Sequence, residues 1–320
     1  MKRTGLRSLL IGIALLTANY VGATDSVTPP KVIIEQEKNS VSSNALQAYW
    51  VFSGIVTNEN GEHYDYYFQM QRKDTQFHAL ATLIDSQSKA VLLFEESDAT
   101  VENFVATNWH VGKIFMHFNP INNSWVFGVK TKENKGFNFK VDMLGQTKIT
   151  PLNHDLRSGV ELSVNQTGRL NGHLQTDEKS SKDQFVTAAK AWFKQIWVSK
   201  SQDTMHPLTG VLCQFNDGSG FYAVNLQEPD ALRGAVAGWR DVQGTAIPMS
   251  QFVSIKENEA GQWSIQISSP KVLLSLQDAL AKTGEKHQLI AGLTEGDRPG
   301  FCTISRDEIG GQVVQAKLGD

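Results

Sequence analysis

The sequence predicts an all-β protein that consists of two antiparallel β domains of similar size. Short runs of β-branched and aromatic residues recur at even spacing, and clusters rich in Gly, Asn and Asp separate them. The polar segment TDEKSSKDQ (176–184) then divides these runs into two sets. Evenly spaced short strands with such turns are typical of sandwiches and barrels. We find no repeat at a fixed short period, which argues against a solenoid or a propeller.

The first set of strands begins at Tyr49. Its first two β-rich runs flank an Asn-Gly turn, which favours a tight antiparallel connection. The later runs alternate with further turns, and a last short pair lies in VELSVNQTGRLNGHLQ (160–175). The predicted turns are NENGE (58–62), SQSK (86–89), NPINN (119–123) and KENKG (132–136).

The second set of strands follows a segment whose secondary structure the sequence pattern does not decide. Residues 183–193 (DQFVTAAKAWF) are compatible with a helix as well as with a strand. Three hairpins and a closing strand around GFCTIS (300–305) follow. The hairpin turns are NDGSG (216–220), RDVQG (240–244) and ENEAG (257–261).

The N-terminus has the pattern of a secretory signal peptide. A basic head with Lys2, Arg3 and Arg7 precedes the apolar run SLLIGIALLTA, and small residues end at Ala23. The apolar run is shorter than the roughly 20 residues of a spanning helix. We therefore expect cleavage after Ala23, no membrane span afterwards, and a periplasmic or secreted protein. The predicted organisation is a signal peptide (1–23), a polar leader (24–46), and β domains at 47–178 and 185–320.

Composition and charge exclude some classes of function. The chain has 320 residues, of which 40% are hydrophobic and 20% are charged, with a net charge of −3. Lysine and arginine are scattered, so a nucleic-acid partner has no electrostatic support. No histidine pairing at metal-ligand spacing and no nucleotide-binding motif occurs in the sequence. We therefore predict no metal and no cofactor, and no residue is identified as a nucleophile.

The two cysteines, Cys213 and Cys302, are a candidate disulfide in an oxidising compartment. They lie in the first and last strands of the second set, and an up-and-down barrel closes by pairing those strands. Two separate buried thiols are the alternative, and a spacing of 89 positions does not resemble a metal site.

Four stretches occur in a characteristic order along the chain: AYWVFSG (48–54), NGEHYDYYFQMQR (60–72), NWHVG (108–112) and AWFKQIW (191–197). Together they resemble the lipocalin-like AttH/CrtC-type family, which includes carotenoid 1,2-hydratase. The resemblance covers most of the chain from Tyr49 onward and is weakest in the last third. It implies two tandem lipocalin-like antiparallel β-barrels or half-barrels packed together.

The resemblance also shows where this chain departs from the family. Ala48 stands where members have an acidic residue, and Lys194 and Gln195 replace the central Asp-His pair. Hydration of an alkene needs a strong positioned acid, and a lysine ammonium with a reference pKa near 10.4 is a poor one. The aromatic walls are retained, which suits a polyunsaturated ligand. The predicted ligand-binding residues are Trp50, Trp109, His117, Trp192, Lys194, Gln195 and Trp197.

Lys194 and Gln195 have different expected roles. Gln195 would orient the polar end of a ligand by hydrogen bonding. Lys194 would attract an anionic head group or extend into solvent, which is the more usual position of a lysine. His117 would face either the interior of a barrel or the surface.

Three functions compete. The first is an exported protein that binds an apolar small molecule, a lipid or an isoprenoid, in an aromatic-lined cavity. The second is a hydratase, cyclase or isomerase that uses another acid, such as Asp65, Asp85 or His117. The third is a structural or assembly factor with filled barrels. A buried unpaired carboxyl beside a cavity would favour the second function, and a filled barrel would favour the third.

Overall fold

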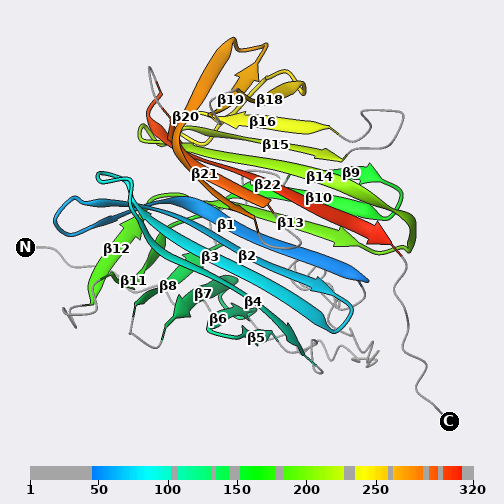
Figure 1. Cartoon of the computed structure of the whole chain (residues 1–320), viewed down its shortest axis with the longest axis horizontal. Coiled ribbons are helices and arrows are strands. Elements are labelled where there is room, and N and C mark those ends of the chain that lie inside the picture. The colour runs from blue at the N-terminus through cyan, green and yellow to red at the C-terminus, as the bar shows by residue number, and fades with distance from the viewer. Residues whose placement is uncertain are drawn as a thin grey trace, which may run out of the picture. The chain divides into compact units, whose positions relative to one another are not determined.

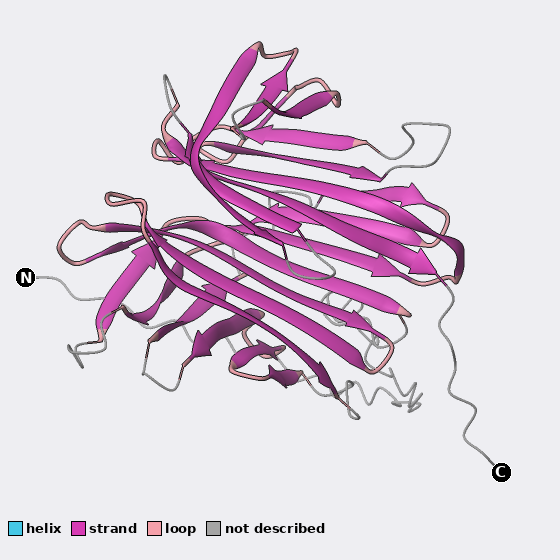
Figure 2. Ribbon diagram, viewed as in Figure 1, coloured by secondary structure: helices cyan, strands magenta, loops and turns pink. Residues whose placement is uncertain are grey.

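All regular elements that the structure describes are β-strands, so the predicted all-β class is confirmed. The structure is a computed structural model, and its strands are shown in Figure 2. It describes residues 45–101, 107–131, 135–143, 152–176, 183–226, 235–258, 262–283, 288–294 and 298–311. The predicted signal peptide and nearly all of the polar leader lie outside these residues. Within the described ranges no helix exists that could cross a membrane.

The first sheet contains thirteen strands and curves back on itself. Ten of them follow the order β4-β3-β2-β1-β12-β11-β8-β7-β6-β5, and β4 also contacts β5 and β6 at the other end of that order. The sheet therefore forms a nearly closed antiparallel barrel (Figure 1). Its strands are β1 (Gln47–Asn58), β2 (His63–Lys73), β3 (Gln76–Asp85), β4 (Val91–Thr100), β5 (Asn108–Val111), β6 (Ile114–Asn119), β7 (Ser124–Lys130), β8 (Gly136–Asp142), β9 (Leu152–Arg157), β10 (Val160–Gln166), β11 (Leu170–Gln175), β12 (Gln184–Ala188) and β13 (Trp192–Val198).

β1 belongs to two branches of this sheet. Its last residues pair with β12, whereas Gln47–Ser53 pair with β13. β13 pairs in turn with β10, and β10 with β9. The segment 183–193, which the sequence left open between helix and strand, therefore contains β12 and the start of β13 and no helix.

The second sheet has nine strands in the order β17-β16-β15-β14-β22-β21-β20-β19-β18. Its first and last strands in the chain, β14 and β22, pair with each other at the centre of this order. Its strands are β14 (Gln202–Phe215), β15 (Gly220–Leu226), β16 (Val236–Arg240), β17 (Ala246–Ile247), β18 (Val253–Glu257), β19 (Trp263–Ile267), β20 (Val272–Thr283), β21 (Gln288–Thr294) and β22 (Gly300–Gly311).

The change from one sheet to the other lies between Val198 and Gln202. The sequence placed the domain boundary at the polar segment 176–184, and this division stays a prediction. β12 and β13 follow that segment and pair with β1. Residues Gln36–Asp320 form one compact unit. The division at 178 and 185 into two domains thus does not coincide with the change of sheet.

Cys213 of β14 lies directly opposite Cys302 of β22, and a disulfide joins them. Their Cα atoms are 4.1 Å apart. The disulfide therefore links the first and last strands of the second sheet in chain order.

The first predicted turn follows the predicted chemistry, whereas most of KENKG (132–136) and ENEAG (257–261) lies outside the described residues. At NENGE, Gly61 has a φ of 80°, a left-handed conformation that costs glycine little. The Asn58 side chain accepts hydrogen bonds from the backbone N–H groups of Asn60 and Glu62. A local side-chain bond of this type replaces ladder pairing where the chain reverses.

Aromatic side chains fill the interior of the first sheet. Phe52 is fully buried, and its ring stacks on Phe127 and Phe193 at centroid distances of 4.1 Å and 4.5 Å. Tyr66 and Trp125 belong to the same cluster. Large side chains that alternate inward along each strand therefore occupy this interior.

The opposite faces of β1, β2, β10 and β13 pack against the second sheet. One hydrophobic cluster joins Tyr49, Leu162 and Ile196 of the first sheet to Leu212 and Tyr222 of the second. Hydrogen bonds cross the same interface, among them Tyr49 Oη to the Glu308 carbonyl at 2.8 Å. The interface therefore combines an apolar core with specific polar contacts.

Candidate functional site

The stretch AWFKQIW forms β13 and places side chains on both sides of the first sheet. Phe193 and Trp197 belong to the aromatic interior of this sheet. Trp192 and Ile196 belong to the cluster at the interface with the second sheet. The alternation expected of a strand is thus present, and one strand serves two different packed regions.

Three of the four tryptophans predicted to bind ligand lie together inside the first sheet. Trp50 and Trp109 have ring centroids 4.9 Å apart, and Trp197 is in the same cluster. Gln195 lies directly opposite Trp50 in the strand register. The indole Nε1 atoms of Trp50 and Trp197 are buried and have no hydrogen-bond partner among the described residues. Whether this group binds a ligand stays a prediction.

Trp192 and His117 lie away from that group. Trp192 is buried at the sheet interface, where its Nε1 donates to the Cys213 carbonyl at 2.8 Å. His117 alternates with Met116 and Phe118, which face the aromatic interior, so it lies on the other face of β6. The predicted residues therefore do not surround one common cavity.

Lys194 is buried at the sheet interface, so the expectation that it extends into solvent is wrong. Its side chain is 2% exposed, and Nζ lies 3.4 Å from Ser305 Oγ of β22. Burial lowers the pKa of Lys194, and the nearby Asp307 carboxylate raises it. Asp307 also accepts a hydrogen bond from Gln69 Nε2 at 3.2 Å, and Gln69 accepts one from Tyr67 Oη. This polar network fixes the second sheet against the first.

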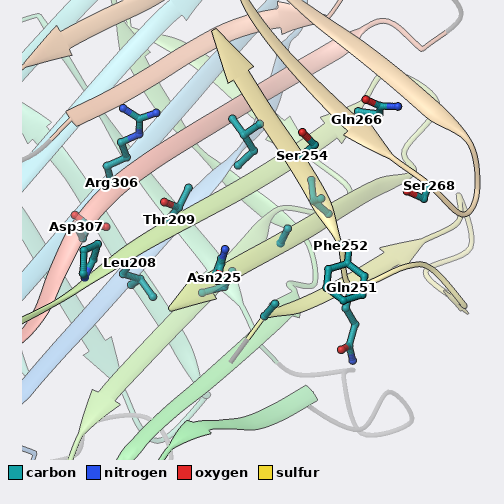
Figure 3. A pocket seen from close by; sticks show the side chains of 16 residues that line it. Leu208, Thr209, Asn225, Gln251, Phe252, Ser254, Gln266, Ser268, Arg306 and Asp307 are labelled. Atoms are coloured by element: carbon teal, nitrogen blue, oxygen red, sulfur yellow. The ribbon is translucent and has the colours of Figure 1, made fainter. Parts of the chain in front are cut away.

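A pocket of about 660 Å³ opens at the inner face of the second sheet. Strands β14, β15 and β22 form one wall, and β18, β19 and the segment before β18 form the other (Figure 3). Phe252 stands at this pocket with 69% of its surface exposed. Ala223, Val253 and Ile255 line its apolar part.

Sequence reasoning selected none of these pocket residues. Each strand contributes only one to three of them, and they lie on segments from Pro207 to Asp307. No spacing along the chain marks such a set, because the strand order brings it together. The one local signal is Phe252, a large apolar residue beside polar neighbours in the segment MSQF.

Asp65 is a second buried ionisable group at the sheet interface. It is fully buried on β2, directly opposite Ile55 of β1 and Ile84 of β3. These two isoleucines pack with Phe301 of the second sheet. Burial raises the pKa of Asp65 to about 7; the Ser86 hydroxyl slightly favours the ionised form, and neither carboxylate oxygen accepts a hydrogen bond of good geometry from a described residue.

A smaller pocket lies next to this carboxyl. It has a volume of about 350 Å³, and its lining includes Ile55, His63, Gln214 and Phe215. Ile55 is the cross-strand neighbour of Asp65, and His63 is two residues before it on the same face of β2. Asp65 therefore lies close behind the wall of this pocket.

The raised pKa of Asp65 predicts a pH-dependent stability. In the unfolded chain this carboxyl titrates near its ordinary value of 3.8. Between pH 4 and pH 7 the folded state keeps a proton that the unfolded state loses, so this group makes the folded state less stable as pH rises. We expect Asp65→Asn to raise the free energy of unfolding by a few kcal/mol at pH 8 and by much less at pH 4. Urea unfolding at both values tests this, and equal effects would contradict it.

The described residues contain no group of three or more His, Cys, Asp or Glu side chains that could hold a metal ion. Three of the buried charged side chains among the described residues, Lys194, Asp307 and Asp65, lie at the interface between the sheets. Arg72, His78, His206 and Arg240 are buried as well.

Comparison with known proteins gives the fold. No protein-family model and no curated protein matches the sequence. The structure is similar to that of a predicted AttH protein from Nitrosomonas europaea, with a TM-score of 0.58 and 12% identity over 82% of this chain and 93% of that one. It is also similar to kievitone hydratase from Nectria haematococca, with a TM-score of 0.54 and 12% identity over 82% of this chain and 89% of that one. The predicted resemblance to the AttH-type lipocalin-like fold is therefore confirmed at the level of fold.

Proposed function

We propose that this protein binds an apolar or amphipathic small molecule, such as a lipid or an isoprenoid, in the pocket of the second sheet. The observation that carries this proposal is the pocket of about 660 Å³ with Ala223, Val253 and Ile255 along its wall. Pockets for small molecules usually measure about 300–1,000 Å³ and combine apolar walls with a few polar groups. The aromatic interior of the first sheet holds its own side chains, with Phe52 and Phe127 fully buried.

The proposal includes export of the mature protein to the periplasm or the medium. The signal-peptide pattern that ends at Ala23 supports it. The disulfide between Cys213 and Cys302 is also favoured in an oxidising compartment. Fractionation of expressing cells tests export, and full-length protein confined to the cytoplasm would contradict it.

Phe252 provides a direct test of ligand binding. Phe252→Ala should weaken the binding of cis-parinaric acid, a fluorescent polyene fatty acid, by about tenfold, because a ligand would cover the exposed ring and bury apolar surface. A fluorescence titration measures this. Leu273→Ala is the matched control, since Leu273 on β20 is 68% exposed and does not line the pocket. Equal losses in both variants, or no saturable binding by the wild type, would contradict the proposal.

Asp65 favours a second candidate function, the hydration of an isoprenoid-like alkene. The fold is shared with kievitone hydratase, and a carboxyl with a pKa of about 7 can remain protonated near neutral pH. In such a reaction the carboxyl proton would go to an alkene carbon. Water would add to the resulting cation and return a proton to the carboxylate. Asp65, behind the pocket at Ile55 and His63, would be the proton donor.

An acyclic carotenoid is a suitable substrate for testing this second function. Hydrated product, detected by chromatography and mass spectrometry, should form with wild-type protein and decline as the pH rises above about 7, because the acid form of Asp65 is then lost. Asp65→Asn should form none. Asp85→Asn is the control, since Asp85 is a neighbouring carboxylate whose oxygen accepts backbone hydrogen bonds from Gln87 and Ser88. Absence of product from the wild type would exclude this substrate.

A further inference from the structure

Strands β20, β19 and β18 end the order of the second sheet and present an outward face to solvent (Figure 1). Ile265, Ile267 and Leu274 on these strands belong to the interior cluster of the second sheet. The residues that alternate with them therefore point outward. The strand register places these outward residues side by side. We call them, together with two exposed flanking residues, the β18–β20 face: Phe252, Ser254, Lys256, Ser264, Gln266, Lys271, Leu273 and Ser275.

Two large apolar side chains protrude from the β18–β20 face. Phe252 directly precedes β18 and is 69% exposed, and Leu273 of β20 is 68% exposed. The register of the three strands separates the two positions by two strand spacings and two residues, which is about 12 Å. Single exposed apolar residues are common on protein surfaces. Two of them on one small face can enter an apolar phase together.

The charged residues of the β18–β20 face are both positive. Lys256 and Lys271 are exposed, and the ion pairs between described residues do not include them. Glu257 lies opposite Trp263, which belongs to the interior cluster, so this carboxylate is on the other side of β18. The whole chain has 33 acidic and 30 basic residues. A face with two lysines and no carboxylate therefore departs from the average charge of this protein.

This combination fits the surface of an anionic lipid bilayer. Lysine ammonium groups near such a surface are attracted by the anionic headgroups. Apolar side chains that extend from the same face are buried at the boundary between headgroups and acyl chains. A second copy of this chain is a poorer partner, because two such faces in contact would bring lysines of the same charge together. The serines and the glutamine can donate hydrogen bonds to phosphate and ester oxygens.

The β18–β20 face also adjoins the pocket of the second sheet. Phe252, Ser254 and Gln266 belong to the face and line this pocket as well (Figure 3). A bilayer that contacts the face would therefore lie beside the pocket.

We propose that the β18–β20 face docks this protein on the surface of an anionic lipid bilayer. Phe252 and Leu273 insert between the headgroups and the acyl chains, and Lys256 and Lys271 contact the phosphates. Docking goes beyond the proposed binding function and does not depend on it. The direct transfer of a lipid between the bilayer and the pocket, which docking would permit, does rest on that function.

Sedimentation with lipid vesicles tests docking. Purified protein is mixed with vesicles of phosphatidylcholine, or of phosphatidylcholine and phosphatidylglycerol in equal parts, and the bound fraction is measured. We expect at least about tenfold tighter binding to the anionic vesicles, because each lysine near an anionic surface contributes about fivefold. Added salt should weaken this binding, since it screens exposed charges. Equal binding to both kinds of vesicle would overturn the proposal.

Three variants assign the binding to the β18–β20 face. Leu273→Asp should weaken binding to the anionic vesicles about tenfold, and Lys256→Gln and Lys271→Gln about fivefold each. Ile121→Asp is the matched control, because Ile121 is 95% exposed in the turn between β6 and β7 and lies outside this face. All these variants share residues 1–23, so a difference between them does not arise from the predicted signal peptide. Equal losses in Leu273→Asp and Ile121→Asp would overturn the proposal.

Docking and ligand binding fail separately. A titration with cis-parinaric acid in the absence of vesicles measures the pocket alone, and Leu273→Asp should leave it unchanged, because Leu273 does not line the pocket. If the probe does not bind but the face variants lose vesicle binding, the binding function is wrong and docking stands. If the probe binds but the face variants sediment with vesicles like the wild type, docking is wrong. Dissociation of an oligomer by Leu273→Asp with unchanged vesicle binding would assign the face to a second copy instead.

Discussion

Replacement of Lys194 by methionine is expected to lower the free energy of unfolding by about 3 kcal/mol. Lys194 is 2% exposed, and it faces Ser305 and the Asp307 carboxylate across the interface between the sheets. Methionine has a similar shape but no charge, so the buried Asp307 carboxylate would lose its attraction to the Lys194 ammonium. Removing one partner of a buried charge pair is much more costly than removing one partner of an exposed pair.

A double-mutant cycle checks this expectation. Asp307→Asn leaves Lys194 without its counter-charge and should also be destabilising, whereas Lys194→Met combined with Asp307→Asn should recover most of the loss. Urea unfolding of the four proteins gives the coupling free energy. Additive effects of the two substitutions would show that the two charges do not interact. Lys113→Met is a suitable surface control, because its ion pair with Glu95 is exposed.

The position of Lys194 shows which part of the sequence prediction was sound. The alternation along AWFKQIW was predicted, and β13 has it. The sequence could not show that both faces of this strand are covered, because the second sheet packs on it through residues far along the chain. Lys194 and Gln195 therefore lie on opposite faces of one sheet.

The turns of the fold were predictable from the sequence, whereas the change of sheet was not. Turns such as NENGE depend on the chemistry of a few adjacent residues, and the structure has the predicted hairpins around 58–62, 86–89 and 216–220. The boundary between the sheets depends instead on the pairing of β13 with β1, which are about 140 residues apart in the sequence. A polar loop at 176–184 was the strongest local signal, and it does not separate the sheets.

The candidate site was predictable only in part. Asp65 was among the acids considered from the sequence, but its burial between Ile55 and Ile84 follows from strand register. The pocket of the second sheet has no signature in the sequence, since strand pairing brings its residues on β14, β15 and β22 together. Tryptophans were predicted to bind a ligand because they are large and aromatic. The structure buries Trp50, Trp109 and Trp192 almost completely.

Trp197→Ala distinguishes the two possible places for a ligand. Trp197 is 8% exposed and belongs to the aromatic interior of the first sheet. Its removal should leave a cavity and lower the free energy of unfolding by about 3–5 kcal/mol. The affinity for cis-parinaric acid should remain within about twofold of the wild type, because the proposed pocket belongs to the second sheet. Urea unfolding and a fluorescence titration of the same sample measure both effects.

Trp263→Ala provides the matched comparison. Trp263 is also buried, at 3% exposure, but it lies under the Arg306 guanidinium at the pocket. Its removal should cost a similar free energy of unfolding and also weaken the binding of cis-parinaric acid, since Arg306, which lines the pocket, would lose the ring on which it stacks. The opposite pattern, with weaker binding by Trp197→Ala alone, would place the ligand among Trp50, Trp109 and Trp197. The two indole N–H groups that have no described partner would then be its donors.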